Sequence, residues 1–208
     1  MIFELLFLAL FFASLALLIG AVILMNRGAR RSATKILLSL GAGWAVYLAI
    51  VALVSAATPQ RIVPIGQDRC FDDMCFAVVH AETVSQLGTA RHPVTAKGVF
   101  RVVAVRVSNR ARGRAMREAG LRALLWSDGE GYGVSPEGQR AWEAANGQTA
   151  ALTARLDPGA SILSVQVFDL PKKASSPGLV LSHGLTPGYF VIGESPILRK
   201  PTLMKIDP

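Results

Sequence analysis

Few residues of this sequence could do chemistry, and the first candidates are its two cysteines. Cys70 and Cys75 stand in the sequence CFDDMC, with four residues between them. In an oxidising compartment, two cysteines this close are expected to form a disulfide. Free thiols are one alternative, and a metal site with Asp72, Asp73 and His80 is another. Structural zinc, however, usually takes four nitrogen or sulfur ligands from paired cysteine units, and no second pair exists. We predict the disulfide and no metal site.

Arginines form the second candidate. Seven arginines and only one acid, Glu118, lie between residues 101 and 122. A guanidinium group can bind a phosphate through two parallel hydrogen bonds, so this segment could contact anionic lipid, lipopolysaccharide or another polyanion. The residues that we predict for this contact are Arg110, Arg112, Arg114 and Arg117. The alternative interpretation is a solvated connection that only keeps the domain soluble.

Side chains that could form an enzyme active site do not gather in the sequence. His80, His92 and His183 are far apart and share no spacing with a carboxylate or a cysteine. Ser182 precedes His183, but adjacent residues of a strand point to opposite faces, which disfavours a shared Ser-His site. The sequence GEGYG lacks the Lys-Ser/Thr of a phosphate-binding loop and is typical of a tight turn. We therefore predict that the protein is not an enzyme and binds no cofactor.

Two long apolar segments precede these residues. The chain is 51% hydrophobic, and the apolar residues concentrate in Ile2 to Met25 and Ile36 to Ala57. Each segment exceeds the roughly 20 residues that a helix needs to cross a bilayer. We predict two transmembrane helices at residues 2–25 and 36–57, which makes the lipid bilayer the first partner of the chain.

Basic residues orient the two predicted helices. Residues 26–35 form a short connection that contains Arg27, Arg30, Arg31 and Lys35. The positive-inside rule places such a connection in the cytoplasm. The N-terminus and residues 58–208 then lie on the periplasmic side of an inner membrane, so nucleic acid is not an expected partner. A cleaved signal peptide is the alternative for the first segment, but Met1 to Glu4 carries no basic residue. A further alternative is that the second segment acts as a signal sequence cut near Val54-Ser55-Ala56.

Small residues recur at helical spacing in both apolar segments. Those that we predict to pack the helices closely are Ala13, Gly20, Gly41 and Ala45. Transmembrane helices associate by close packing, because lipid offers no hydrophobic driving force between them. The alternative is that alanine and glycine are simply common in membrane helices.

The pattern changes after a linker at residues 58–66, where Pro59 and Pro64 disfavour helix. Residues 67–208 contain short β-branched or apolar runs between turn signals, which indicates an antiparallel β-sandwich. The strands that we expect are Phe76–Ala81, Val99–Ser108, Leu121–Trp126, Gly131–Val134, Ala151–Leu156, Ser161–Phe168, Gly178–Ser182 and Tyr189–Ile192. Residues 112–124 and 136–146 have helix-forming composition and are expected to be short helical or loop insertions.

Turn chemistry supports these strands. Asp128 and Gly129 fall between two expected strands and favour a hairpin. Asp157-Pro158-Gly159 favours a type II turn between the next two, because glycine tolerates the positive φ that such a turn requires. In Val99–Ser108, Val103, Val105 and Val107 alternate with Phe100, Val102 and Ala104, which predicts burial on at least one face.

These features resemble a known family. The valine-rich strand ending at Asn109, the hairpin with Leu125, Asp128, Gly129 and Tyr132, and the run from Leu156-Asp157-Pro158-Gly159 to Phe168-Asp169-Leu170-Pro171 resemble telokin-like, immunoglobulin-like extracellular domains of bacterial lipoproteins and membrane-anchored proteins. The resemblance covers about residues 97–182. It implies an immunoglobulin-like sandwich without catalytic residues. The arginine-rich segment and the insertion around Trp142 depart from the family pattern.

Two functions follow as hypotheses. The first is a membrane-anchored extracytoplasmic interaction or structural module of the bacterial envelope, which binds a protein or a polyanionic surface. The second is an accessory or sensor subunit of a membrane complex, in which the helical hairpin carries the partner interface. The sequence indicates no particular oligomeric state.

Overall fold

The computed structural model describes residues 2–174, 177–183 and 200–207. The chain divides into two compact units, with a boundary between Gln60 and Arg61. The first unit is helical and the second is built from β-strands. Each is described by itself below.

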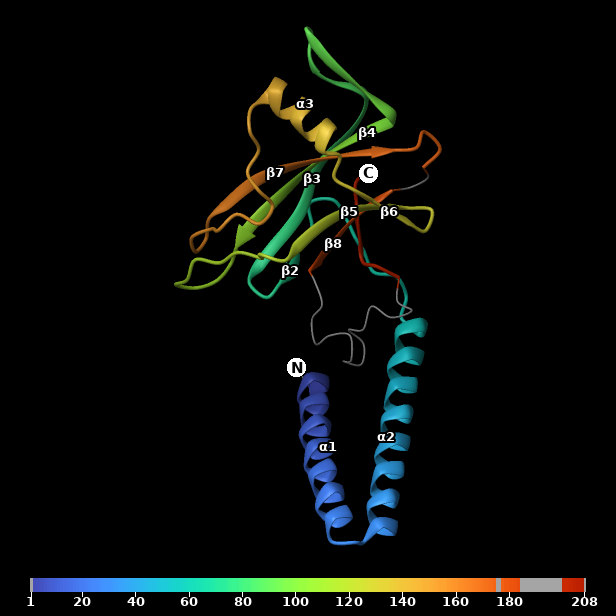
Figure 1. Cartoon of the computed structure of the whole chain (residues 1–208). Helices are drawn as coiled ribbons and strands as arrows, with labels where there is room; N and C mark the ends of the chain where they lie inside the picture. Colours follow the sequence, from blue (N-terminus) through green and yellow to red (C-terminus); the bar gives the residue numbers. More distant parts are fainter. Residues whose placement is uncertain (1, 175–176, 184–199, 208) are drawn as a thin grey trace. The chain divides into compact units, whose positions relative to one another are not determined.

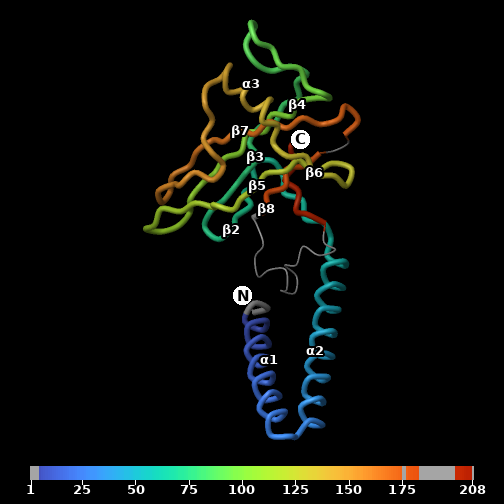
Figure 2. The backbone as a smooth tube through the Cα atoms, in the orientation of Figure 1, coloured from blue at the N-terminus to red at the C-terminus, as the bar shows by residue number. Residues whose placement is uncertain are grey.

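The helical unit is a hairpin of α1 (Ile2–Asn26) and α2 (Arg30–Ala57), which lie side by side in opposite directions (Figures 1 and 2). The predicted ten-residue connection is wrong in its length, because only residues 27–29 lie between the helices. Gly28 has a φ of +80°, which lets the chain reverse this tightly. The backbone N–H groups of Ser32 and Ala33 already donate to the carbonyl of Ala29, so α2 begins directly after the turn.

Both helices are long and apolar enough to cross a membrane. Most of their large apolar side chains are exposed, and Leu38 and Leu53 are 68% and 70% exposed. An apolar surface of this extent is characteristic of helices that contact lipid or another protein.

The β unit is a sandwich of two sheets, so the predicted fold class of two apolar helices followed by a β-domain is confirmed. One sheet has the strand order β1-β9-β8-β5-β6, and the other has the order β2-β3-β4-β7. Their bounds are β1 Ile62–Val63, β2 Arg69–Phe71, β3 Met74–Thr89, β4 His92–Asn109, β5 Leu121–Ser127, β6 Glu130–Gly133, β7 Ser161–Leu170, β8 Gly178–His183 and β9 Leu203–Lys205. The pair β1–β9 is parallel, and the other described pairs are antiparallel.

The main core lies between the two sheets. Phe76, Val105 and Phe168 contribute from the four-stranded sheet, and Leu125 and Leu181 from the five-stranded sheet. Each of these side chains is 1% exposed or less. The predicted alternation in β4 is therefore correct, with its odd-numbered valines from residue 103 to 107 facing this core.

The opposite face of β4 is also buried, because α3 (Pro136–Asn146) covers it. Phe100, Val102 and Val167 form a second apolar cluster there, and Trp142 of α3 packs against it. The predicted insertion at residues 136–146 is thus a helix. Ser135 caps its N-terminus, since the Ser135 Oγ accepts a hydrogen bond from the N–H of Gly138 at 3.1 Å.

The outer edge of β7 is occupied by side chains. Gln139 of α3 donates to the carbonyl of Val165 at 3.1 Å and accepts from the N–H of Val167 at 3.0 Å, as a neighbouring strand would. The Thr149 hydroxyl accepts from the N–H of Val165 at 2.8 Å. These contacts protect an edge that would otherwise pair with other chains.

The expected strand at residues 151–156 is wrong. Residues 147–155 form a loop beside β7, and the Ser164 hydroxyl donates to the carbonyl of Ala150. Leu156 forms only an isolated bridge with Met116. A strand cannot form there because β4 pairs with one edge of β7 and α3 with loop residues occupies the other.

The predicted turns are correct in their local geometry. Asp128 and Gly129 have φ values of +52° and +87°, and they join β5 to β6. Gly159 has a φ of +76°, and the N–H of Ala160 donates to the carbonyl of Asp157, which is the pattern of a type II turn.

Other boundaries differ from the prediction. Residues 112–120 contain no helix, and β5 begins at Leu121. β1 lies within the predicted linker, and neither β2 nor β9 was expected. The expected strand at residues 189–192 falls outside the described residues.

β3 and β4 form a hairpin much longer than the predicted strands. Their pairing runs from Met74 with Asn109 to Thr89 with His92, whereas β7 pairs with β4 only from Val99 to Ser108. The far half of the hairpin, drawn in green, therefore extends past the rest of the sheet (Figures 1 and 2). Arg91 lies at its tip.

Candidate anion-binding surface

The predicted arginine contacts lie in a loop that a buried asparagine holds in place. We call residues 110–117 the arginine loop. Asn109, at the end of β4, is 1% exposed. Its Nδ2 donates to the carbonyl oxygens of Arg114 and Leu156 at 3.0 and 2.9 Å, and its Oδ1 accepts from the N–H of Ala111 at 2.8 Å. Three hydrogen bonds of one side chain thus fix the backbone of the loop and join it to Leu156.

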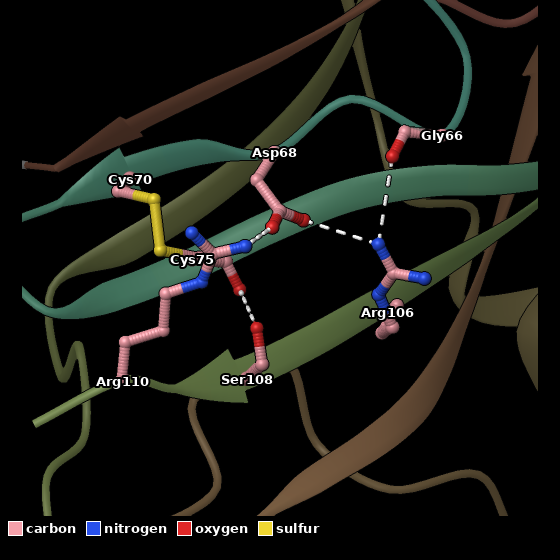
Figure 3. Close-up of polar contacts among 7 residues, drawn as sticks. All are labelled: Gly66, Asp68, Cys70, Cys75, Arg106, Ser108 and Arg110. Carbon is pink, nitrogen blue, oxygen red and sulfur yellow. Dashed lines mark hydrogen bonds and ion pairs between the residues drawn. A yellow bond between two sulfur atoms is a disulfide. The ribbon is translucent and has the colours of Figure 1, made fainter. Parts of the chain in front are cut away.

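The turn opposite the arginine loop carries acids. We call residues 68–73 the acid turn. The Asp68 carboxylate accepts hydrogen bonds from Arg106, at 3.2 Å, and from Arg110 (Figure 3). The Asp68 side chain is only 15% exposed, so water screens these ion pairs less than it screens pairs at the open surface.

A second pair of contacts joins the two segments. Arg114 lies 3.3 Å from an oxygen of Asp72 and 3.5 Å from an oxygen of Asp73. The Arg110 N–H also donates to the carbonyl of Asp73 at 2.8 Å. The Arg114 guanidinium is 63% exposed, and ion pairs in this setting contribute about 0–1 kcal/mol. Their effect is chiefly to neutralise Arg114.

The predicted disulfide closes the acid turn. Cys70 of β2 and Cys75 of β3 are bonded, and they are direct partners in the strand register (Figure 3). Asp72, within the turn, has a φ of +53°. Cys75 is 1% exposed, so the disulfide ties the turn to a buried position of the sandwich. It thereby limits the positions from which Asp68, Asp72 and Asp73 reach the arginines.

The four predicted contact residues therefore differ in their surroundings. Arg110 and Arg114 are paired with the acid turn, as described above. Arg112 and Arg117 are exposed, and neither has an ion pair or a side-chain hydrogen bond within the described residues. Of the four, only Arg112 and Arg117 have a positive charge that no acid among the described residues compensates and that remains available to a ligand.

Sequence reasoning missed the acids that pair with the arginines. Asp68 lies 38 residues before Arg106 and 42 before Arg110. The antiparallel register of β2, β3 and β4 brings them together, and no local spacing indicates it. The only signal was that the acid turn contains three of the few acids in this half of the chain.

The predicted packing residues of the helices do not form the contact between α1 and α2. Ala13, Gly41 and Ala45 are exposed, and a Cβ at Gly20 or Gly41 would meet no atom within 4 Å. Other residues of the helices are buried instead, among them Ala21 and Ala33 at 1% exposure, and larger side chains contribute as well. The Trp44 Nε1–H donates to the Ser14 hydroxyl at 3.0 Å, and the Trp44 and Phe7 rings lie 6.4 Å apart, edge to face.

The basic residues that we predict to set the topology lie at the closed end of the hairpin. Arg27 is in the turn, and Arg30, Arg31 and Lys35 are in the first turns of α2. They remain close to the connection, although most are helical.

One open depression of about 680 Å³ lies where β4, β6, α3 and the end of β7 meet. Lys97, Tyr132, Glu137 and Lys172 line it. Its Asp169 carboxylate is already occupied, because both oxygens accept backbone N–H groups, from Lys97 and Gly98. The Tyr132 hydroxyl donates to Glu130 at 2.9 Å, and this hydrogen bond raises the pKa of Tyr132 above its usual value.

The residues of the alternative metal site are used otherwise. The cysteines are in the disulfide, Asp72 and Asp73 face Arg114, and His80 is exposed on β3. Among the residues that the structure describes, no three His, Cys, Asp or Glu side chains form a group that could hold a metal ion.

Known proteins resemble this chain only in structure. No protein-family model matches it, and no curated protein matches it. A conserved hypothetical protein from Bacillus anthracis has 16% identity and a TM-score of 0.47, over 58% of this chain and 88% of that one. An uncharacterised β-sandwich protein from Clostridium difficile also has 16% identity, with a TM-score of 0.42 over 72% and 96%.

The yjhA protein from Bacillus subtilis has 16% identity and a TM-score of 0.42, over 70% of this chain and 99% of that one. Likenesses at this level concern the fold alone. The telokin-like, immunoglobulin-like family is not confirmed by them and stays a prediction.

Proposed function

We propose that this protein is a membrane-anchored, non-catalytic interaction module of the bacterial envelope, with its telokin-like sandwich outside the cytoplasm. The observation that carries the proposal is the arginine loop. Asn109 fixes the loop backbone, and Arg112 and Arg117 extend from it into solvent without an acidic partner among the described residues. Such a surface suits contact with an anionic partner, because a preformed loop loses little conformational entropy on binding.

The helical hairpin supports the membrane anchor. Its exposed side chains are apolar along both helices, and the basic residues gather at the turn. By the positive-inside rule, this turn is cytoplasmic and Thr58 is on the far side. The disulfide agrees with that orientation, since disulfides persist in oxidising compartments.

Attachment to a membrane would make weak contacts sufficient. Each exposed arginine near an anionic surface is worth about 1 kcal/mol. A tether holds the domain close to its partner surface and so raises the effective concentration of these contacts. Two or three unpaired arginines would then give measurable binding without a deep pocket.

A vesicle-binding experiment tests this function. The full-length protein in phosphatidylcholine nanodiscs is mixed with sucrose-loaded phosphatidylglycerol vesicles and sedimented at increasing salt. We expect binding that weakens with salt, and a loss of about fivefold for Arg112→Ser. Arg91→Ser, at the tip of the β3–β4 hairpin, removes the same charge elsewhere and serves as the matched control. Equal losses for both variants, or no preference for anionic vesicles, would reject the arginine loop as the contact.

A second candidate function is favoured by the exposed small residues of the helices. Gly41 and Ala45 take no part in the contact between α1 and α2, so this face of α2 is available to another membrane helix. The protein would then be an accessory or sensor subunit of a membrane complex. Partners that co-purify with the full-length chain should be lost in Gly41→Leu/Ala45→Leu if the helices bind them. Partners that persist in this variant but disappear without residues 67–208 would assign the contact to the sandwich.

A further inference from the structure

Arg155, which lies far from the arginine loop in sequence, stands beside Arg117. Met116 and Leu156 form an antiparallel bridge, and each donates its N–H to the carbonyl of the other, at 2.9 and 2.8 Å. In an antiparallel pair, the residue after one partner stands across from the residue before the other. Arg117 and Arg155 are therefore cross-strand neighbours.

The two arginines point away from the core. Successive side chains of an extended segment alternate in direction, and Leu156 is buried in the main core, with Met116 packed against it. Arg117 and Arg155 are both exposed. The Asn109 side chain also fixes this bridge, because its Nδ2 donates a hydrogen bond to the Leu156 carbonyl. The bridge thus fixes the adjacent backbone positions from which the two arginine side chains extend.

Like charges directly across two strands are destabilising unless something compensates them. The nearest acids in the sequence are Glu118 and Asp157, and neither forms an ion pair with Arg117 or Arg155 in the described part of the chain. Arg106, Arg110 and Arg114, by contrast, are all neutralised by the acid turn. The uncompensated pair is placed where an external anion would relieve its repulsion.

We propose that Arg117 and Arg155 form a phosphate-binding pair that holds the phosphodiester of an anionic phospholipid. This inference rests on the proposed function, since it names the ligand of the same surface. Two planar guanidinium groups match the oxygens of one phosphate through parallel N–H···O bonds. We assign this phosphate to a phospholipid headgroup, because a membrane-anchored chain meets lipid headgroups at high effective concentration.

The test measures whether the two arginines act together. Full-length protein in phosphatidylcholine nanodiscs is titrated with phosphatidylglycerol vesicles, using Arg117→Ser, Arg155→Ser and the double variant. Residues that share one ligand have non-additive effects. We expect each single change to weaken binding about tenfold, and the double change to weaken it no more than about twofold further. Independent losses that multiply in the double variant would indicate diffuse attraction and overturn the pair.

A conservative variant separates the effect of the positive charge from that of the guanidinium shape. Arg117→Lys keeps the positive charge but loses the two-pronged donor. We expect it to weaken vesicle binding at least threefold, whereas Arg140→Lys on the exposed surface of α3 should change nothing. Wild-type affinity in Arg117→Lys would overturn the proposed bidentate contact. Circular dichroism and thermal unfolding of each variant confirm folding, and removal of the repulsion should not lower the melting temperature.

Other outcomes distinguish this inference from the function on which it rests. Vesicle binding that depends on Arg112 but not on Arg117 or Arg155 would refute the pair and keep the proposed anionic contact. No binding to anionic vesicles by the wild type would refute both. Calorimetric binding of inorganic phosphate by the wild type, together with anionic vesicle binding that Arg117→Ser leaves unchanged, would show a free phosphate site and overturn the lipid as ligand.

Discussion

The two helices leave their apolar side chains exposed, whereas the strands of the sandwich bury theirs. Leu38 and Leu53 are about two-thirds exposed, at 68% and 70%, but Phe76 and Phe168 have no exposed surface. In water, burial of apolar area stabilises a fold by about 25 cal/mol per Å². The sandwich therefore contains its own source of stability. The exposed apolar side chains of the hairpin contribute no such stability in water.

The two units also differ in how far along the chain their polar contacts reach. In the sandwich, Asn109 and Gln139 bond backbone groups up to 47 and 28 residues away. In the hairpin, the Ser14 hydroxyl donates to the Leu10 carbonyl, one helical turn earlier, and accepts a single bond from Trp44 of α2. Loss of a polar group should consequently cost more in the sandwich than in the hairpin.

The largest difference between the units is expected from matched aromatic truncations. Phe168→Ala removes a fully buried ring from the main core and should lower the free energy of unfolding of the sandwich by about 3–5 kcal/mol. Phe12→Ala removes a ring that is 62% exposed on α1 and should leave it unchanged. Denaturant unfolding followed by near-UV circular dichroism measures both. Similar losses of unfolding free energy in both variants would contradict the expectation that only the sandwich is stabilised by burial of its apolar side chains.

Asn109→Ala is the next largest change. It leaves the Arg114 carbonyl and the N–H of Ala111 without their partner, while the Leu156 carbonyl keeps the hydrogen bond from the Met116 N–H. Unpaired buried groups cost about 1–3 kcal/mol each, and water entering the loop would recover part of that, so we expect about 3 kcal/mol in total. Hydrogen exchange should also accelerate in residues 110–117 and not in β5. Unchanged exchange in the loop would show that Asn109 does not hold it.

The disulfide provides a smaller, local contribution. Cys70→Ser/Cys75→Ser opens a link between residues five apart and should cost about 2 kcal/mol by the chain-entropy relation. Reduction of the wild type should lower the melting temperature to the same extent, and the chain has no other cysteine to confuse the measurement. A variant as stable as the oxidised wild type would show that the sheet register alone fixes the acid turn.

Local patterns predicted the parts of the fold that depend on neighbouring residues. The apolar length of the helices, the valine alternation in β4 and the positive φ at Gly159 all follow from the sequence near each position. Residues 151–156 were predicted to be a strand because they precede the turn at Asp157-Pro158-Gly159. Their conformation is decided by Gln139 and Thr149, which occupy the edge of β7.

The candidate site was predictable only in part for the same reason. The density of arginine is local, so the arginine loop could be identified from sequence. Which arginines are neutralised depends on the register that brings Asp68 to Arg106 and Arg110. One isolated bridge, between Met116 and Leu156, brings Arg155 beside Arg117. No residue near either arginine in the sequence indicates that the two are neighbours.

The smallest expected effect tests the polar contact of the hairpin. Ser14→Ala leaves the Trp44 Nε1–H without its oxygen acceptor, and such contacts between transmembrane helices average about 0.6 kcal/mol. The change should lower the detergent midpoint at which energy transfer between dyes attached at the open end of the hairpin reports loss of the helix contact.

Ser39→Ala is the matched control, because Ser39 is exposed on α2 and has no side-chain hydrogen bond in the described part of the chain. A double-mutant cycle with Trp44→Phe then isolates the bond from the packing of the ring against Phe7. Coupling near 0.6 kcal/mol would place this contact well below that of Asn109, as the comparison of the two units requires. Coupling of several kcal/mol would mean that this one polar pair holds the hairpin together. The two units would then differ in their environment and not in the strength of their polar interactions.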